Sequence, residues 1–129
     1  MNLHEETFQL CAVPLFRRID VSKLKLLAFT SERQEFAAGE IICHQGEEGE
    51  SAFVILRGQV EVLVAAGPEG TPTKVSELGP NSVVGEMATL CDRPRSATIR
   101  ALTPVDALRI PRDSMRGLLH SNPLAMIEI

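Results

Sequence analysis

The residues best suited to chemistry lie between Gly85 and Ala101, in the run GEMATLCDRPRSATIRA. Gly85 permits a close approach of the backbone, and residues 86–90 are long enough for about one and a half turns of helix. The N-terminus of such a helix presents free amide groups and the positive end of the helix dipole to an anion. Arg95 follows at the start of a predicted strand, fixed by Pro94, and its planar guanidinium suits two oxygens of one phosphate.

Glu86 is the second polar group of this segment, and it has a different task. Because it is itself an anion near the same helix start, we expect it to accept hydrogen bonds from a ligand hydroxyl. One anion site, one hydroxyl acceptor and a small apolar neighbourhood together describe a site for a sugar phosphate. A plainer interpretation stays open, in which Gly85 and Glu86 cap a helix and Arg95 makes a surface ion pair worth under ~1 kcal/mol.

Helical patterns flank the region that must position this segment. Residues 3–29 have a helical period that Pro14 divides into two helices. In the second helix the apolar residues fall on one face behind a predicted N-cap at Asp20, namely Val21, Leu24, Leu27 and Ala28. A further helix is predicted over residues 111–119, and Asn122 with Pro123 is typical of the start of a last helix. We expect that helix to end at Ile129.

Between these helices the sequence changes to short strands separated by glycine-rich turns. Ala52–Leu56 is predicted to be a fully buried strand, and Val60, Val62 and Val64 form one face of the next. Two more strands are predicted over residues 97–101 and 106–110, and residues 66–73 form a hairpin loop. The order of elements predicts an α+β domain built on an antiparallel, jelly-roll-like β-roll. Its expected parts are N-terminal helices (1–30), the roll (31–111) and C-terminal helices (112–129).

Composition bounds the function. The 129 residues have 44% apolar content, which suits a single domain with one core. No apolar run approaches the ~18 residues of a membrane span, and residues 1–10 are too polar for a signal peptide, so we expect a cytoplasmic protein. The net charge of -4 argues against a surface that binds nucleic acid directly. Positive charge is instead local, and it gathers in one stretch with Arg93, Arg95, Arg100, Arg109 and Arg112.

The segment from Gly85 resembles the phosphate-binding cassette of cyclic-nucleotide-binding domains, as in kinase regulatory subunits, bacterial cyclic-nucleotide-gated channels and the catabolite activator protein. The shared pattern is Gly-Glu-x-Ala-Leu followed by Pro-Arg-x-Ala-Thr, with Thr89 standing before Leu90 here. Two further runs are similar to the family, FAAGEIICHQGEEGESAFVILRGQVEV to its first strands and PLFRRIDVSKLKLLA to its helical bundle. The resemblance covers residues 12–127.

The resemblance implies specific roles in a ligand site. Arg95 would pair with the cyclic phosphate, Glu86 would take the ribose 2'-hydroxyl, and backbone amides near Gly85 and Ala88 would complete the anion site. Ser96 would offer a hydroxyl to the phosphate or to the 2-amino group of a syn guanine, and we favour cAMP slightly over cGMP. The implied ligand-binding residues are Gly85, Glu86, Met87, Ala88, Arg95, Ser96 and Ala97.

Two positions and the length of the final helix depart from the family pattern. Leu56 stands where kinase regulatory domains have an acidic residue that orients the cassette arginine, so Arg95 must be held less rigidly or by another group. Val84 occupies a position that is commonly aromatic. The final helix is expected to be too short to close over the base as the family's lid does.

These features predict a regulatory sensor that binds a cyclic nucleotide and relays its occupancy to an effector module in the same or another chain, whether a channel, transporter, kinase or transcription regulator. No enzyme activity, cofactor or metal is expected. A cupin metal site would need clustered histidines, whereas His4, His44 and His120 are far apart. The alternative is a degenerate domain of the same fold that binds no nucleotide and serves assembly or docking, and a homodimer remains compatible with the sequence.

The three cysteines complete the sequence picture. Cys11, Cys43 and Cys91 are widely spaced and contain no Cys-x-x-Cys pair. We expect reduced and mostly buried thiols.

Overall fold

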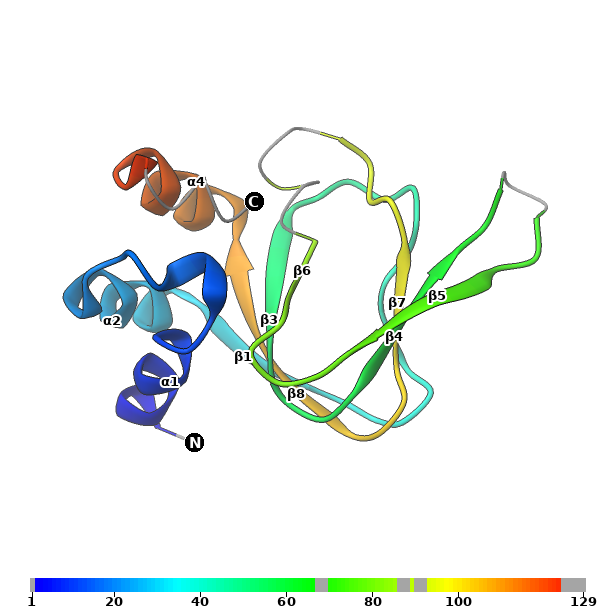
Figure 1. The fold of residues 1–129 in the computed structure, drawn as a ribbon, viewed down its shortest axis with the longest axis horizontal. Coiled ribbons are helices and arrows are strands. Elements are labelled where there is room, and N and C mark those ends of the chain that lie inside the picture. Colours follow the sequence, from blue (N-terminus) through cyan, green and yellow to red (C-terminus); the bar gives the residue numbers. More distant parts are fainter. Residues whose placement is uncertain (1, 67–69, 86–88, 90–92, 124–129) are drawn as a thin grey trace.

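Among the described residues, three α-helices gather on one side of a roll of eight strands (Figure 1). The computed structural model describes residues 2–66, 70–85, 89 and 93–123. The helical elements are α1 (Leu3–Leu10), the 3-10 helix η1 (Pro14–Phe16), α2 (Val21–Thr30) and α4 (Arg112–His120). No helix within the described residues is both long and apolar enough to cross a bilayer.

The strands form two antiparallel sheets of four strands each. The first sheet has the order β1 (Glu32–Phe36), β8 (Val105–Pro111), β3 (Ser51–Arg57) and β6 (Val83–Val84). The second has the order β2 (Ile41–Cys43), β7 (Thr98–Ala101), β4 (Val60–Val64) and β5 (Thr73–Leu78). The predicted α+β architecture with an antiparallel roll is therefore confirmed.

Strand β3 lies at the centre because both of its faces are covered. It is buried at all but its last residue, as the run Ala52–Leu56 predicted. Since side chains alternate along a strand, one set packs with the helices and the other with the second sheet. The first set is Ala52, Val54 and Leu56, and the second is Phe53 and Ile55.

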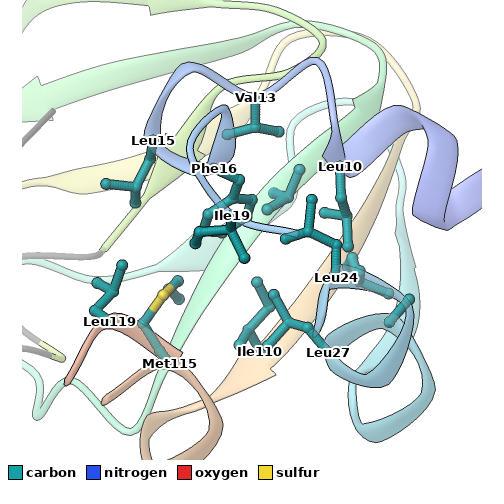
Figure 2. Packing of buried hydrophobic residues seen from close by; sticks show 14 of the residues in the cluster. Leu10, Val13, Leu15, Phe16, Ile19, Leu24, Leu27, Ile110, Met115 and Leu119 are labelled. Carbon is teal, nitrogen blue, oxygen red and sulfur yellow. The ribbon is translucent and has the colours of Figure 1, made fainter. Parts of the chain in front are cut away.

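The helix-side cluster contains most of the largest buried side chains. Figure 2 shows residues from η1, α2, α4 and β8 converging on one apolar interior. The members labelled there are Leu10, Val13, Leu15, Phe16, Ile19, Leu24, Leu27, Ile110, Met115 and Leu119. Because α4 belongs to this cluster, the C-terminal helix is attached to the first sheet by apolar packing.

A second cluster lies inside the roll, where the two sheets face each other. Phe36 and Phe53 meet edge to face there, with ring centroids 6.3 Å apart. The buried members are Cys43, Phe53, Ile55, Val60, Val84, Ile99, Ala101, Val105 and Ala107. The strands that frame this interior also carry the ends of the candidate segment.

Glu61 on β4 is buried at 6% exposure, and its Oε1 accepts a hydrogen bond from Arg100 Nη2 at 2.9 Å across β4 and β7. Two local expectations need correction or qualification. Asp20 precedes α2 as predicted, but its side chain makes no capping hydrogen bond. Cys43 is buried as expected, whereas Cys11 is exposed. Cys91 and the last helix, from residue 124, lie outside the described residues.

Candidate functional site

Two backbone hydrogen bonds hold Arg95 in place. Its amide donates to the Glu47 carbonyl oxygen at 2.8 Å, and its carbonyl accepts from the Gly46 amide at 2.8 Å. The loop that leads into β3 therefore pairs directly with the segment that carries Arg95, which precedes β7 (Thr98–Ala101) and is not the strand start that the sequence predicted. This loop is itself tied, because the Glu47 carboxylate accepts hydrogen bonds from the backbone and ring of His44. Those bonds, the backbone one first, lower the pKa of Glu47.

The guanidinium of Arg95 is a buried cation with an incomplete set of partners. The side chain is 7% exposed, and Nη2 donates to the Ser51 carbonyl oxygen at 2.8 Å. The guanidinium carbon lies 5.9 Å from the Phe53 ring centroid, a cation–π contact. Within the described part of the chain, Nη1 has no hydrogen-bond partner and no carboxylate pairs with Arg95. A buried charge without a counter-charge is costly, so this site favours the arrival of an anion.

Gly85 lies against this guanidinium. Its φ of +80° is in the left-handed region, and a Cβ at this position would collide with Arg95 Nη1. Glycine is therefore required here both for its backbone angle and for its lack of a side chain. The Gly85 carbonyl accepts from the amide of Thr89 at 3.2 Å and from its hydroxyl at 2.9 Å. Both contacts join residues four apart in the sequence, the spacing of helical backbone hydrogen bonds.

A cavity of about 400 Å³ opens beside these two residues. Its volume falls within the range of about 300–1,000 Å³ that is usual for small-molecule sites. Both sheets contribute to its apolar wall, with Cys43, Val62, Leu78, Val83, Val84 and Ile99. The remaining lining residues come from the candidate segment, namely Gly85, Arg93, Pro94, Arg95, Ser96 and Ala97. The cavity is thus an apolar chamber with positive charge at one end.

The structure brings together four of the seven predicted site residues. These line one cavity, and they are Gly85, Arg95, Ser96 and Ala97. Glu86, Met87 and Ala88 lie outside the described residues, so their roles stay predictions. Leu56 faces the helix-side cluster, and the Ser51 carbonyl instead holds Arg95. The sequence left open whether Arg95 is held less rigidly or by another group, and the Ser51 carbonyl is such a group.

The apolar wall was missed from the sequence. Cys43, Val62, Leu78 and Val83 carry no chemical signal of their own, and they meet only because of strand pairing. The register does connect some of them, since Cys43 pairs with Ile99 and Val62 pairs with the same residue from the other side. Strand pairing of this kind was the one signal that would have found them.

The described residues offer no alternative metal site. No group of three or more histidine, cysteine, aspartate or glutamate side chains is placed to hold an ion in the part of the chain that the structure describes. The lining of the cavity suits a ligand that is an anion with an apolar body.

A family model described as "Cyclic nucleotide-binding domain" matches residues 33–122, which include the strands, the cavity and Arg95. This chain belongs to the cyclic nucleotide-binding domain family. The match agrees with the resemblance found in the sequence, and it confirms the fold that the cassette and the roll predicted.

Two curated relatives show how this domain occurs in longer proteins. The chain is 36% identical over 112 residues to a cyclic nucleotide-gated potassium channel from Mesorhizobium japonicum, covering 87% of this chain and 29% of the channel. It is 34% identical over 119 residues to a cAMP-dependent protein kinase regulatory subunit from Dictyostelium discoideum, covering 91% of this chain and 36% of that subunit. The chain therefore spans about a third of the length of these relatives.

A solved structure gives the same fold with a different ligand. The regulatory subunit of a cAMP-independent protein kinase A from Trypanosoma cruzi, bound to guanosine, superposes with a TM-score of 0.86 at 30% identity. The alignment covers 98% of this chain and 44% of that one. The molecule bound to that regulatory subunit, guanosine, is a nucleoside and has no phosphate.

Proposed function

We propose that this domain is a regulatory sensor that binds a cyclic nucleotide in the cavity beside Arg95, with cAMP slightly favoured over cGMP. The observation that carries the proposal is the buried guanidinium of Arg95, whose Nη1 has no partner among the described residues. A cyclic phosphate would supply the missing charge and acceptor, and a charge-assisted hydrogen bond in a site shielded from water is a strong one.

The rest of the cavity suits the other parts of such a ligand. The short helix expected from the sequence over residues 86–90 would direct backbone amides towards the anion, and Ser96 adds a hydroxyl to the cavity lining. Glu86 would accept the ribose 2'-hydroxyl, and the amides near Ala88 would complete the phosphate site. The apolar wall of Val62 and Leu78 offers a surface for the base.

A hydrogen bond links the cassette to the C-terminal helix and supports a relay. Arg116 Nε on α4 donates to the Thr89 carbonyl oxygen at 2.9 Å, and Thr89 is fully buried. If the cassette tightens on an anion, this hydrogen bond would therefore transmit the movement to α4. We infer that α4 takes one position with the ligand bound and another without it. This difference would report occupancy to an effector module, in this chain or another, in a cytoplasmic setting.

A second candidate is a domain that has lost the cyclic ligand and binds a nucleoside or nothing. The guanosine-bound Trypanosoma cruzi relative favours it, together with Leu56 in place of the acidic partner of the arginine. The buried Arg95 argues against it, because a nucleoside supplies no counter-charge and no carboxylate among the described residues pairs with this arginine.

Calorimetric titration of the 129-residue domain with cAMP, cGMP and guanosine tests these alternatives. The proposal expects saturable binding of cAMP, cGMP of equal or weaker affinity, and guanosine weaker than both. Tighter binding of guanosine than of either cyclic nucleotide would favour the nucleoside candidate. If none of the three compounds gives heat or a thermal shift, the domain binds no nucleotide, and a role in assembly or docking would be the remaining alternative.

A further inference from the structure

We infer that the thiol of Cys43 is a modification site inside the ligand cavity, where reaction with a small electrophile and occupation by an anionic ligand at Arg95 exclude each other. The inference deepens the proposed function, because it rests on the same cavity being the ligand site.

The position of Cys43 follows from strand pairing. It is the last residue of β2, it pairs with Ile99 of β7, and both residues line the cavity. Its side chain is buried at 6% exposure within the cluster between the two sheets. A reagent that modifies this thiol in the folded domain must therefore enter through the cavity.

A second, independent feature indicates that the same cavity receives a ligand. The Arg95 side chain is more than nine-tenths buried and lines the cavity, and its Nη1 lacks a partner among the described residues. An anion drawn to this guanidinium would fill the space through which Cys43 is reached. An electrophile bound to the sulfur would occupy the same space.

The electrostatics of the thiol make it a slow but selective nucleophile. Burial raises the pKa of Cys43, while Arg95 and a backbone hydrogen bond from Ile99 act in the opposite direction and Glu47 adds to the increase. The thiolate fraction at neutral pH is therefore smaller than that of an exposed cysteine. The same positive charge on Arg95 should attract anionic reagents over neutral ones.

Alkylation by iodoacetate or iodoacetamide probes the reactivity of this thiol. The Cys43 thiolate attacks the methylene carbon, a sulfur–carbon bond forms, the carbon–iodine bond breaks and iodide leaves. The thiol proton goes to solvent, and no electron is gained or lost from outside. With iodoacetate the product is a carboxymethyl group, whose carboxylate provides an anion for Arg95.

Two matched variants isolate the reaction. Cys11→Ser with Cys91→Ser retains only Cys43, and Cys43→Ser with Cys91→Ser retains only the exposed Cys11 as the control. Mass spectrometry follows the rate of each alkylation across pH. We expect Cys43 to react more slowly than Cys11 and to need higher pH. We also expect its ratio of iodoacetate to iodoacetamide rates to exceed that of Cys11 by on the order of 3- to 10-fold.

The ligand arm tests mutual exclusion. With cAMP at about 100 times its Kd the cavity is free in about 1% of molecules, so the Cys43 rate should fall on the order of 100-fold while the Cys11 rate stays unchanged. The carboxymethylated Cys43 protein should lose cAMP binding in calorimetry. The Cys43→Ser protein should show the same cAMP affinity before and after the same treatment.

The outcomes separate this inference from the proposed function. If cAMP binds but leaves Cys43 alkylation unchanged, the inference fails and the proposed function stands. If cAMP does not bind, yet Cys43 keeps an iodoacetate preference that Arg95→Leu abolishes, the thiol site stands and the cyclic-nucleotide function fails. If Cys43 reacts only as fast as the domain unfolds, with no preference between reagents, the cavity is not its route and the inference is overturned.

Discussion

The two apolar clusters on either side of strand β3 differ in what they enclose. The helix-side cluster contains only hydrophobic side chains, including the fully buried Phe16, Leu24 and Met115. The cluster inside the roll is bordered by a cavity of about 400 Å³ and by the buried cation of Arg95. Cavities and unpaired charges cost stability, so the domain keeps them on the side where a ligand can compensate. Stability and binding should accordingly respond to different mutations.

The largest effect should come from the helix-side cluster. Phe16→Ala removes a fully buried aromatic ring and should lower the free energy of unfolding by about 3–5 kcal/mol, measured by urea denaturation. Ligand affinity of the protein that stays folded should change little, because Phe16 lies on the other side of β3 from the cavity. If too little folded protein remains, Ile19→Val at about 0.5–1.5 kcal/mol gives the same test. If the binding free energy fell by as much as the free energy of unfolding, the helix-side cluster would contribute to binding as well as to stability, and the proposed separation between the two clusters would be wrong.

Arg95→Leu should produce the converse result. We expect cAMP binding to weaken by about 2–5 kcal/mol, since the phosphate loses its buried charge partner. The free energy of unfolding should stay equal or rise, because a leucine replaces a buried cation that has no counter-charge among the described residues. Calorimetry and urea denaturation check the two halves. Arg109→Leu, on β8 and outside the cavity lining, is the control and should retain binding.

Glu86→Gln should have a smaller effect on the same side. A hydrogen bond to a charged group contributes about 1.5–3 kcal/mol, so cAMP affinity should fall within that range. The 2'-deoxy analogue of cAMP sharpens the test. Wild type should bind the analogue less tightly than cAMP, whereas Glu86→Gln should show a much smaller difference. Equal losses in both proteins would take the ribose role away from Glu86.

The smallest effect should fall on the link between the two regions. Arg116→Ala removes the hydrogen bond from α4 to the Thr89 carbonyl and should weaken cAMP binding by about 1 kcal/mol. Amide hydrogen exchange is the sharper measurement. In wild type, cAMP should raise protection over residues 85–90 and change it over residues 112–126, and the second change should shrink in Arg116→Ala. His120→Ala, exposed on the same helix, is the control. An unaltered response in Arg116→Ala would exclude this contact as the relay.

The sequence predicted the parts of this molecule whose signals are local. The buried strand through Val54 and the helix after Pro111 follow from short-range patterns, and one short motif selected both Gly85 and Arg95, which the structure places in contact. The cavity wall escaped prediction because its members are far apart in the sequence, and Cys43 and Leu78 come to line one cavity only through sheet register.

Discrimination between cAMP and adenosine tests the central claim most directly, because the two ligands differ in the cyclic phosphate that Arg95 is proposed to hold. Calorimetry would compare both ligands on wild type and on Arg95→Leu. The account predicts that wild type prefers cAMP by about 2–5 kcal/mol and that the preference falls below about 1 kcal/mol in Arg95→Leu. A preference for cAMP that is the same in both proteins would contradict the assignment of Arg95 to the phosphate.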